Sequence, residues 1–497
     1  MSELKFAKTI TDPVHGTIGL TQLEADIIST PTFQRLHNVR QLGLAHLVFP
    51  GANYSRFSHS VGACHNAGRI LEAIERNTPN KKFDVEKHQA CRLAGLLHDI
   101  GHYPFSHATE HIIKSVYSDK NLLAPTDNTV TTEEATDPSL PPYLDHETVG
   151  RQVIDNDPFL LEVFKRHNWA VASIKEIFSK ESPDTSFVQV ISSDLDCDRL
   201  DYLRRTAHTS GLPYGTVDID YLIDQACLDP NGYYCFSFKA LRAADHLLVS
   251  RYYDYLQVPF HKTVVALEWS LVTCIEELIN RGMVSCSSSD IVGKIKSGEW
   301  ALFDDNYFFS LFRELRSSLN VAEESDSVLS SHLEALLMRK AAKLVHAVEI
   351  VEGKTESDHA ARVQKAHAAI DKISASLGIP KKYFHVWGHH LELTKAGSKF
   401  ADAEFEGAVN ILYQDRATPL MKFPQALMQT LAKYQYSGVR IYMIDREAHH
   451  NEAKTLFEAE LPPQLGEGPG LPSEPSEPSE PSEPSEPLGN VVEGEQE

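Results

Sequence analysis

Apolar residues recur at spacings of three and four positions as far as residue 280, and this period constrains the fold more than any other feature of the sequence. It predicts helices in residues 23–43, where Pro31 stands near a helix N-terminus, and in residues 84–101, where Gly101 ends the helix. The chain is therefore predicted to be mostly α. Further helices with the same period are predicted at Val149–Phe164, Phe187–Leu203, Leu241–Gln257 and Thr263–Ile279.

Strand-like patterns are confined to short segments. KTITDPVHGTIGLTQ (8–22) predicts a small N-terminal β-hairpin, and GYYCFSF (232–238) and VRIYMID (439–445) alternate as strands do. Residues 290–461 are predicted to form an α+β C-terminal region. Its clearest helices are predicted in SLFRELRSSL (310–319) and SHLEALLMRKAAKLVHAVEIV (331–351).

Residues 462–497 differ in composition from the rest of the chain. They are rich in Pro, Ser and Glu, and five consecutive SEP triplets occupy residues 473–487. Such a segment cannot bury enough apolar surface to offset the entropy lost on ordering. We therefore predict a disordered tail.

The net charge of −22 is only partly due to the nine glutamates of this tail, so the rest of the chain is acidic too. An acidic surface argues against nucleic-acid binding through general phosphate neutralisation, which makes nucleic acid at most a secondary partner. It is compatible with a small anionic substrate that is bound in a local basic funnel. A small-molecule partner is therefore predicted.

The seven cysteines are scattered and form no C-x-x-C pair, so neither a disulfide framework nor a cysteine-based zinc site is predicted. The N-terminus lacks the pattern of a signal peptide, and no window reaches the roughly 18 uncharged apolar residues of a membrane span. We expect a soluble, cytoplasmic protein.

The stretch LLHDIGHYPFSH (96–107) places His98 and Asp99 at the end of an apolar helix. The pair alone fits either a metal site or a helix-terminal charge beside a solvated acid. His59, in the predicted first turn of a helix, and Asp198, on a later helix, complete a mixed nitrogen and oxygen set. Such a set suits Mn, Fe, Zn or Ni rather than Mg, and leaves coordination positions open for water or phosphate.

These four residues reproduce in order the H…HD…D pattern of the HD-domain phosphohydrolases, which the sequence resembles. HDIGHYPFSH, FQRLHNVRQLG, VFPGANYSRFSHSVG and RYYDYLQVPFHKT resemble the deoxynucleoside triphosphate (dNTP) triphosphohydrolase branch, which contains bacterial dGTPases and the SAM-and-HD-domain dNTPase. The resemblance spans roughly residues 8–280. It implies an HD-domain helical fold over residues 1–289, with a metal-binding core at about 50–210, followed by the C-terminal region 290–461.

The resemblance also implies roles for individual residues. His107 and Glu110 would form a pair near the scissile phosphate, where a carboxylate fixes the tautomer of a histidine and raises its pKa toward the working range. Arginines suit the triphosphate because their fixed donors meet phosphate oxygens in pairs. The other implied site residues are His102 and His146 in the catalytic pocket, Arg56, Arg199, Tyr202 and Arg251 at the triphosphate, Gln41 and Leu42 at the sugar, and Tyr255 and His261 in the pocket wall.

The implied reaction is hydrolysis of a dNTP to deoxynucleoside and inorganic triphosphate, with magnesium entering alongside the bound triphosphate. The branch also implies a homo-oligomer. Two other functions stay open: an HD phosphodiesterase or nucleotidase acting on another phosphate ester, and a catalytically silent nucleotide-sensing assembly protein. The sequence names neither the metal nor the preferred dNTP.

The sequence departs from the family pattern at five positions. Glu110 stands where aspartate is usual, which shifts the carboxylate by about one bond length. Ser29 and His37 replace an aspartate and an arginine that help to bind a guanine nucleotide activator, so guanine-specific activation is not expected. Thr206 replaces an acid near the phosphates, and Pro259 replaces an aromatic residue near the sugar.

Overall fold

The computed structural model describes residues 4–118, 141–182, 184–354, 357–392 and 408–462. Apart from Pro462, the predicted tail (462–497) lies outside these residues. Up to residue 290 the described residues are mainly helical. The α-helices there are α1 (Gln22–Ile28), α2 (Pro31–Gln34), α3 (Arg56–Asn77), α4 (Val85–Leu97), α5 (His107–Ser118), α6 (His146–Asn156), α7 (Pro158–Arg166), α8 (Ala172–Phe178), α9 (Thr185–Ile191), α10 (Cys197–Ser210), α11 (Ile219–Asp224), α12 (Leu241–Gln257) and α13 (Lys262–Asn280).

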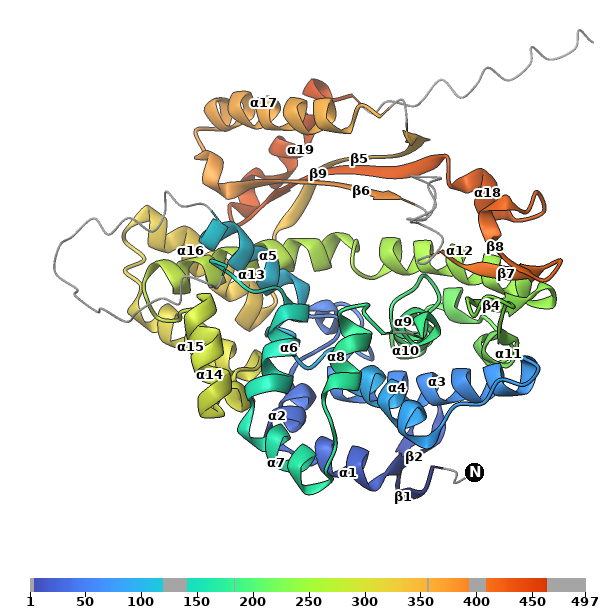
Figure 1. The fold of residues 1–497 in the computed structure, drawn as a ribbon. Coiled ribbons are helices and arrows are strands. Elements are labelled where there is room, and N and C mark those ends of the chain that lie inside the picture. Colours follow the sequence, from blue (N-terminus) through green and yellow to red (C-terminus); the bar gives the residue numbers. More distant parts are fainter. Residues whose placement is uncertain (1–3, 119–140, 183, 355–356, 393–407, 463–497) are drawn as a thin grey trace, which may run out of the picture.

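Later segments add helices and most of the strands, so the predicted mostly α fold with an α+β C-terminal region is confirmed (Figure 1). The later helices are α14 (Ser288–Ser297), α15 (Asp305–Ser318), α16 (Glu324–Met338), α17 (His359–Leu377), α18 (Leu427–Leu431) and α19 (His450–Glu460). The strands are β1 (Phe6–Asp12), β2 (Gly16–Thr21), β3 (Ala226–Leu228), β4 (Tyr234–Ser237), β5 (Lys343–Gly353), β6 (Phe384–Glu392), β7 (Asn410–Tyr413), β8 (Arg416–Pro419) and β9 (Tyr434–Met443).

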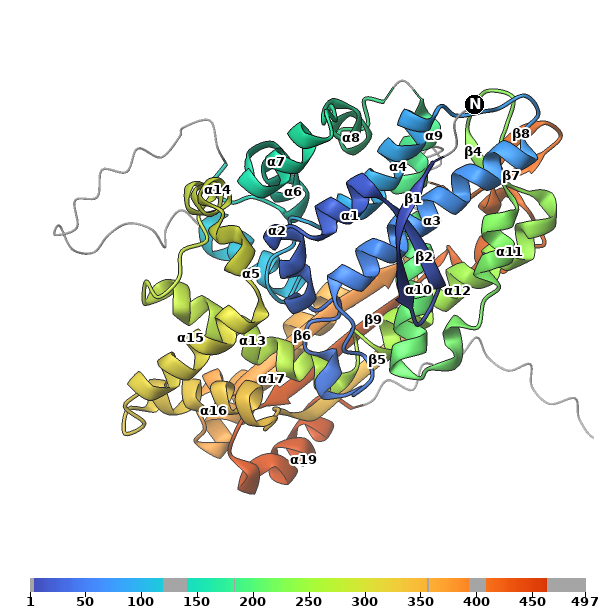
Figure 2. The same cartoon turned by 90° about the horizontal axis from the view of Figure 1, so that it is seen from below.

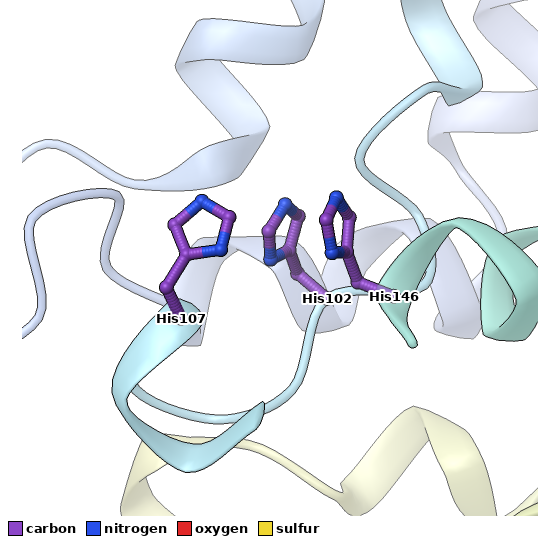
Figure 3. A group of neighbouring side chains, drawn as sticks. All are labelled: His102, His107 and His146. Carbon is purple, nitrogen blue, oxygen red and sulfur yellow. The ribbon is translucent and has the colours of Figure 1, made fainter. Parts of the chain in front are cut away.

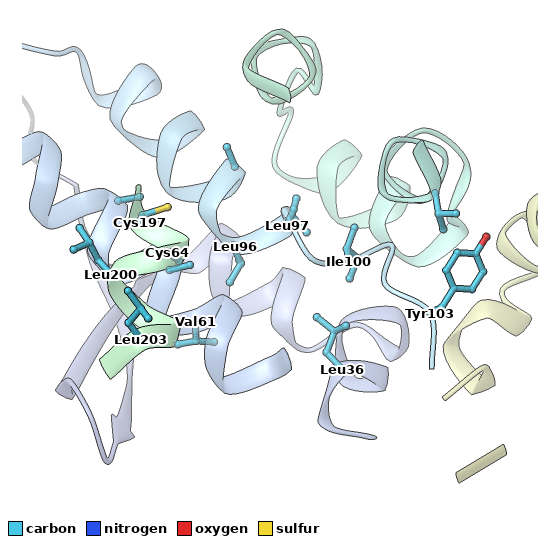
Figure 4. Close-up of a cluster of buried hydrophobic side chains, with 14 of the residues drawn as sticks. Leu36, Val61, Cys64, Leu96, Leu97, Ile100, Tyr103, Cys197, Leu200 and Leu203 are labelled. Atoms are coloured by element: carbon cyan, nitrogen blue, oxygen red, sulfur yellow. The ribbon is translucent and has the colours of Figure 1, made fainter. Parts of the chain in front are cut away.

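The predicted N-terminal hairpin is confirmed: β1 and β2 pair antiparallel, and β2 lies against α3 (Figure 2). Helices α3, α4 and α10 form the centre of the HD region and bury a continuous apolar cluster between them (Figure 4). Its members include Val61 and Cys64 from α3, Leu96 and Leu97 from α4, and Leu200 and Leu203 from α10. This packing holds fixed the helix ends that carry the H…HD…D residues.

Three of the predicted helices are interrupted, each by a residue that caps a new helix. Thr30 caps α2 ahead of Pro31, and Asp157 caps α7 ahead of Pro158. Asp196 accepts from the amides of Ser193 and Arg199 and so starts α10 separately from α9. Proline has no N–H and suits the first position of a helix, so these breaks follow from local chemistry.

The helix predicted to continue to Gly101 ends at Leu97. Tight turns follow, in which the amide of Ile100 donates to Leu97 O and that of His102 donates to Asp99 O. The chain therefore leaves the helix where His98 and Asp99 begin, and these side chains turn into the interior.

The helix predicted at 331–351 is wrong in its second half. It ends at Met338, where Arg339 adopts the left-handed conformation (φ 60°), and residues 343–353 form β5. The run KLVHAVEIVEG alternates between polar and apolar residues over part of its length and is rich in Val and Ile, which favours a strand once a partner is present. That partner is β9, which contains the correctly predicted strand VRIYMID.

The C-terminal sheet has the order β5–β9–β6 and is antiparallel throughout. Helices α17 and α19 cover its outer face, while its inner face lies over α12 and α13 (Figure 1). Alternate residues of β6 show this polarity: His385 stacks on Trp269 of α13, whereas His390 contacts His359 of α17. The inner face of this sheet is therefore directed toward the HD region.

The main apolar core draws its residues from Ile18–Leu336 and Val409–Ala432 and includes residues of α14, α15 and α16. A second cluster lies between the C-terminal sheet and α17 and α19. The boundary at 289/290 stays a prediction. All seven cysteines are buried free thiols, as the absence of a disulfide framework predicts. Within the described ranges, the helices are too short or too polar to cross a membrane.

Candidate active site

The four predicted metal ligands converge from three helices. His59 lies in the first turn of α3, His98 caps the C-terminus of α4 with Asp99 directly after it, and Asp198 lies in the first turn of α10. His59 Nε2 is 2.9 Å from Asp198 Oδ1 and 3.5 Å from Asp99 Oδ2. His98 Nε2 is 3.3 Å from Asp99 Oδ1 and 3.8 Å from Asp198 Oδ1. Side chains separated by more than a hundred residues therefore meet at one point.

Both imidazoles are oriented as metal ligands require. His59 Nδ1 contacts Asp201 Oδ2 at 2.7 Å, and His98 Nδ1 contacts Gly95 O at 2.8 Å. An acceptor that contacts one ring nitrogen fixes the tautomer and leaves the other nitrogen for the metal. Nε2 of both rings is buried and faces the Asp99 and Asp198 carboxylates. This mixed donor set fits a divalent transition metal.

The protonation of His59 supports the same conclusion. Burial alone would lower the pKa of His59, but the carboxylates of Asp198 and Asp201 raise it to about 10. The cluster therefore attracts positive charge between its carboxylates. A metal ion bound there would displace that proton.

A buried network behind His59 was not anticipated from the sequence. Asp201 accepts from Arg205 Nε and Nη2, both at 2.8 Å, and contacts His15 Nε2 at 2.6 Å. Arg205 also donates to Asp12 at 2.7 Å. Burial alone would raise the pKa of Asp201, but Arg205 and the two histidines hold it well below its usual range. Asp201 is one helical turn from Asp198, and this spacing was the only available signal.

Arg56, which was expected to contact the triphosphate, binds the metal ligand Asp99. Its guanidinium donates to Asp99 Oδ2 at 2.5 Å and to Ser106 Oγ at 2.9 Å, and it is almost fully buried. Burial would raise the pKa of Asp99, but Arg56 with His98 and His102 keeps it well below its usual range. Arg56 therefore holds Asp99 ionised and in place, and it also lines the cavity described below.

Three histidines form a row beside the metal ligands (Figure 3). The rings of His102 and His146 stack with centroids 4.1 Å apart and planes 19° from parallel, and His107 meets His102 edge to face at 5.0 Å. A single ion in the plane of one stacked ring would lie far from the plane of the other. The row therefore suits proton transfer better than a second metal.

Glu110 links two of these histidines. Its Oε2 is 2.8 Å from His146 Nδ1 and 3.5 Å from His107 Nδ1, so the expected partner, His107, is the more distant one. Burial would raise the pKa of Glu110, but the two histidines hold it well below its usual range. Burial would likewise lower the pKa of His146, but Glu110 reverses this and raises it. Glu110 and His146 thus stabilise each other's ionised forms.

A cavity of about 800 Å³ joins these groups. His261 does not line it; this residue caps α13, where its ring accepts from the amide of Thr263 and packs on Phe49. Glu110 lies behind the histidine row, and His59 behind the other metal ligands. The predicted site residues that do line the cavity are Gln41, Leu42, Arg56, His98, Asp99, His102, His107, His146, Asp198, Arg199, Tyr202, Arg251 and Tyr255.

Two arginines of the cavity are held by carboxylates. Arg199 Nη1 is 3.2 Å from Asp196 Oδ2 and 3.8 Å from Asp194 Oδ1, and Arg251 Nη1 is 3.5 Å from the same Asp194 oxygen. Asp194 therefore brings two guanidinium groups from α10 and α12 together. This arrangement leaves several donors of each group for an anionic ligand.

The loop that carries His102 and His107 is held by residues outside the HD motif. Asp305 Oδ1 accepts from the amide of Phe105, which has a positive φ of 56°. Arg35 donates to His102 O and to Phe303 O, both at 2.6 Å, and its guanidinium stacks on Trp300. Burial lowers the pKa of Arg35 to about 9. Arg35 lies in the FQRLHNVRQLG segment, but no sequence motif marks Trp300, Phe303 or Asp305.

The positions that depart from the family pattern have local partners. Thr206 Oγ1 lies 2.8 Å from Tyr54 Oη, and Pro259 lines the cavity. His37 stacks on Phe57 with centroids 3.7 Å apart, and Ser29 Oγ donates to Ala25 O. These contacts give Ser29 and His37 structural roles within α1 and its neighbours.

Residues 56–203 match the family described as the HD domain. An uncharacterized protein of Bacillus subtilis, YwfO, is 24% identical over 473 residues, which cover 91% of this chain and 96% of that protein. The deoxynucleoside triphosphate triphosphohydrolase SAMHD1 of Xenopus laevis is 45% identical over 100 residues, which cover 20% of this chain and only 16% of that protein.

A solved structure of a phosphohydrolase from Bacteroides thetaiotaomicron superposes with a TM-score of 0.63 and covers 88% of this chain and 99% of that chain. At 22% identity the likeness concerns the fold. The matched family covers all four converging ligands, His59, His98, Asp99 and Asp198. Residues 56–203 therefore form an HD domain.

Proposed function

We propose that this protein hydrolyses dNTPs to deoxynucleosides and inorganic triphosphate. The observation that carries the proposal is the meeting, around one cavity, of a complete H…HD…D ligand set, a histidine row and two arginines that share Asp194. The similarity to SAMHD1, which is named a deoxynucleoside triphosphate triphosphohydrolase, supports the same reaction. The ligand set alone would serve any phosphate ester, and the paired arginines favour a triphosphate.

His59, His98, Asp99 and Asp198 would hold a divalent metal, which supplies Lewis-acid activation of water and of the α-phosphoryl group. Arg199 and Arg251 offset the charge of the triphosphate with planar, permanently charged donors.

His107 is the most exposed member of the histidine row, and it delivers the proton to the 5′-oxygen of the leaving deoxynucleoside. Glu110 orients the ring of His107, and His146 beside it favours the ionised form of Glu110.

The sugar would lie near Gln41 and Leu42, which both line the cavity. Gln41 Oε1 is buried without a hydrogen-bond partner, so a sugar hydroxyl would satisfy it. A leucine beneath the sugar excludes a 2′-hydroxyl sterically. Buried polar groups that only the correct ligand satisfies give strong discrimination, which favours deoxynucleotides over ribonucleotides.

The test is an assay of the purified chain, loaded with Mn²⁺, against dATP, dCTP, dGTP and dTTP, with products separated by chromatography. We expect equimolar deoxynucleoside and triphosphate, and loss of both products in Asp198→Ala. Release of orthophosphate or pyrophosphate in place of triphosphate would refute the assigned bond. A homo-oligomer and a cytoplasmic location stay predictions, which size-exclusion chromatography and cell fractionation would test.

A further inference from the structure

One carboxylate in the cavity has no part in the proposed chemistry. Glu268 lies on α13 and lines the cavity, while its flanking cavity residues Val264, Leu271 and Val272 are apolar. Among the described residues, its carboxylate forms no hydrogen bond and no ion pair. Burial raises the pKa of Glu268 to about 7. An acidic group in such surroundings is costly unless a ligand supplies donors.

The surroundings of the cavity on this side are aromatic. Tyr255 follows Arg251 by one turn of α12, and Phe260 lies in the turn between α12 and α13. Trp387 and His389 reach the cavity from the inner face of β6, and both rings lie 5.1 Å from Phe260. Flat apolar walls of this kind suit a stacked nucleobase.

The wall is continuous with the triphosphate arginines. Arg251 and Tyr255 lie one turn apart on α12, Val258 follows the end of that helix, and Val264 and Glu268 continue the lining along α13. A nucleotide held by Arg251 at its phosphates can therefore extend along these two helices. Its base then reaches the aromatic residues and Glu268.

We propose that Glu268 reads the Watson–Crick edge of the base and selects dNTPs whose base carries an amino group. This inference rests on the proposed function and names the substrate class of the same site. A carboxylate accepts hydrogen bonds from the amino groups of guanine, adenine and cytosine. Guanine offers two adjacent N–H donors. Thymine presents its ring N–H between two carbonyl oxygens, which face the carboxylate unfavourably.

The test compares kcat/KM for the four dNTPs between the wild type and Glu268→Gln. The amide of glutamine can donate to a carbonyl oxygen, so it accommodates thymine. We expect the wild type to hydrolyse dTTP least, and the ratio of kcat/KM for dTTP to that for dGTP to rise by about tenfold or more in the variant. The change should appear mainly in KM, because Glu268 does not touch the reacting atoms.

His390→Ala is the matched control. His390 follows His389 on β6 but lies on the outer face of the sheet, against His359. This variant should keep the wild-type ratio among the four dNTPs. Glu268→Asp, which keeps the charge but withdraws the carboxylate by one methylene, should lower kcat/KM for dGTP without a gain for dTTP.

The outcomes separate the two proposals. If the wild type hydrolyses dNTPs but Glu268→Gln leaves the dTTP to dGTP ratio unchanged, the base-reading role is overturned and the proposed function stands. A wild-type protein that hydrolyses dTTP in preference to the other three dNTPs would also overturn the base-reading role of Glu268 and leave the proposed function standing. If the wild type hydrolyses none of the four dNTPs, both proposals fail together.

Discussion

Replacing Asp201 with asparagine tests how strongly the network behind His59 supports the metal site. The side chain is fully buried, and both of its oxygens accept, from His15, His59 and twice from Arg205. Asparagine keeps the shape but loses the charge and turns an NH2 group toward donors. Removing one partner of a buried ion pair costs about 3–5 kcal/mol. Because Arg205 still has Asp12 as an ionic partner in the variant, we expect the loss of unfolding free energy to lie at the lower end of this range, about 3 kcal/mol.

Two measurements on Asp201→Asn separate stability from metal binding. Urea denaturation of metal-free protein gives the free energy of unfolding, and calorimetric titration gives the affinity for Mn²⁺, which should fall by about 10- to 100-fold. Asp220→Asn is the matched control, since this carboxylate also pairs with two arginines, Arg69 and Arg204, but is 51% exposed. It should cost less than about 1 kcal/mol and leave Mn²⁺ affinity unchanged. Wild-type Mn²⁺ affinity in Asp201→Asn would refute the positioning role.

Three further variants test other parts of the site. In Gly62→Ala the new Cβ would lie 1.9 Å from Asp201 Oδ1, so the Asp201 carboxylate must move. The affinity for Mn²⁺ should therefore fall as it does in Asp201→Asn. An Mn²⁺ affinity equal to that of the wild type would contradict this geometry. Arg251→Ala should reduce dNTP hydrolysis at least about 100-fold, whereas an unchanged rate would favour a phosphodiesterase or nucleotidase. Glu110→Gln should cost about 1–3 kcal/mol, measured by urea denaturation across pH. The loss of unfolding free energy should be largest between pH 4.5 and 6.5. The lowered pKa of Glu110 stabilises the folded protein above pH 4.5, and the raised pKa of His146 stabilises it below pH 6.5. A loss that does not vary with pH would contradict the interaction of Glu110 with His146.

The sequence predicted those parts of the molecule that depend on local pattern. The helical period located α4, α12 and α13, and the order of His59, His98-Asp99 and Asp198 predicted a convergence that the structure reproduces. Apolar period alone did not reveal the breaks at Thr30, Asp157 and Asp196. Each of these residues satisfies backbone amides with its own side chain, and this signal is present in the sequence but is weaker than the apolar pattern.

The remaining features depend on contacts between distant segments. His15 meets Asp201 across 186 positions, and nothing in the sequence around either residue indicates this contact. The strand β5 was predicted as helix because its pattern fits both periods until β9 lies beside it. His107 and Glu110 lie one helical turn apart and were expected to pair, yet Glu110 binds His146 more closely because α6 packs nearby. Tertiary neighbours decided each of these cases.

The anchoring of the histidine loop by Arg35 and Asp305 limits how the protein can be shortened. A fragment that stopped at residue 289 would contain every HD motif, yet Arg35 would lose the carbonyl of Phe303 and the face of Trp300. The amide of Phe105 would lose its acceptor on Asp305. Truncation at residue 289 would therefore remove the anchors of the histidine loop, although the fragment would still contain all four HD ligands.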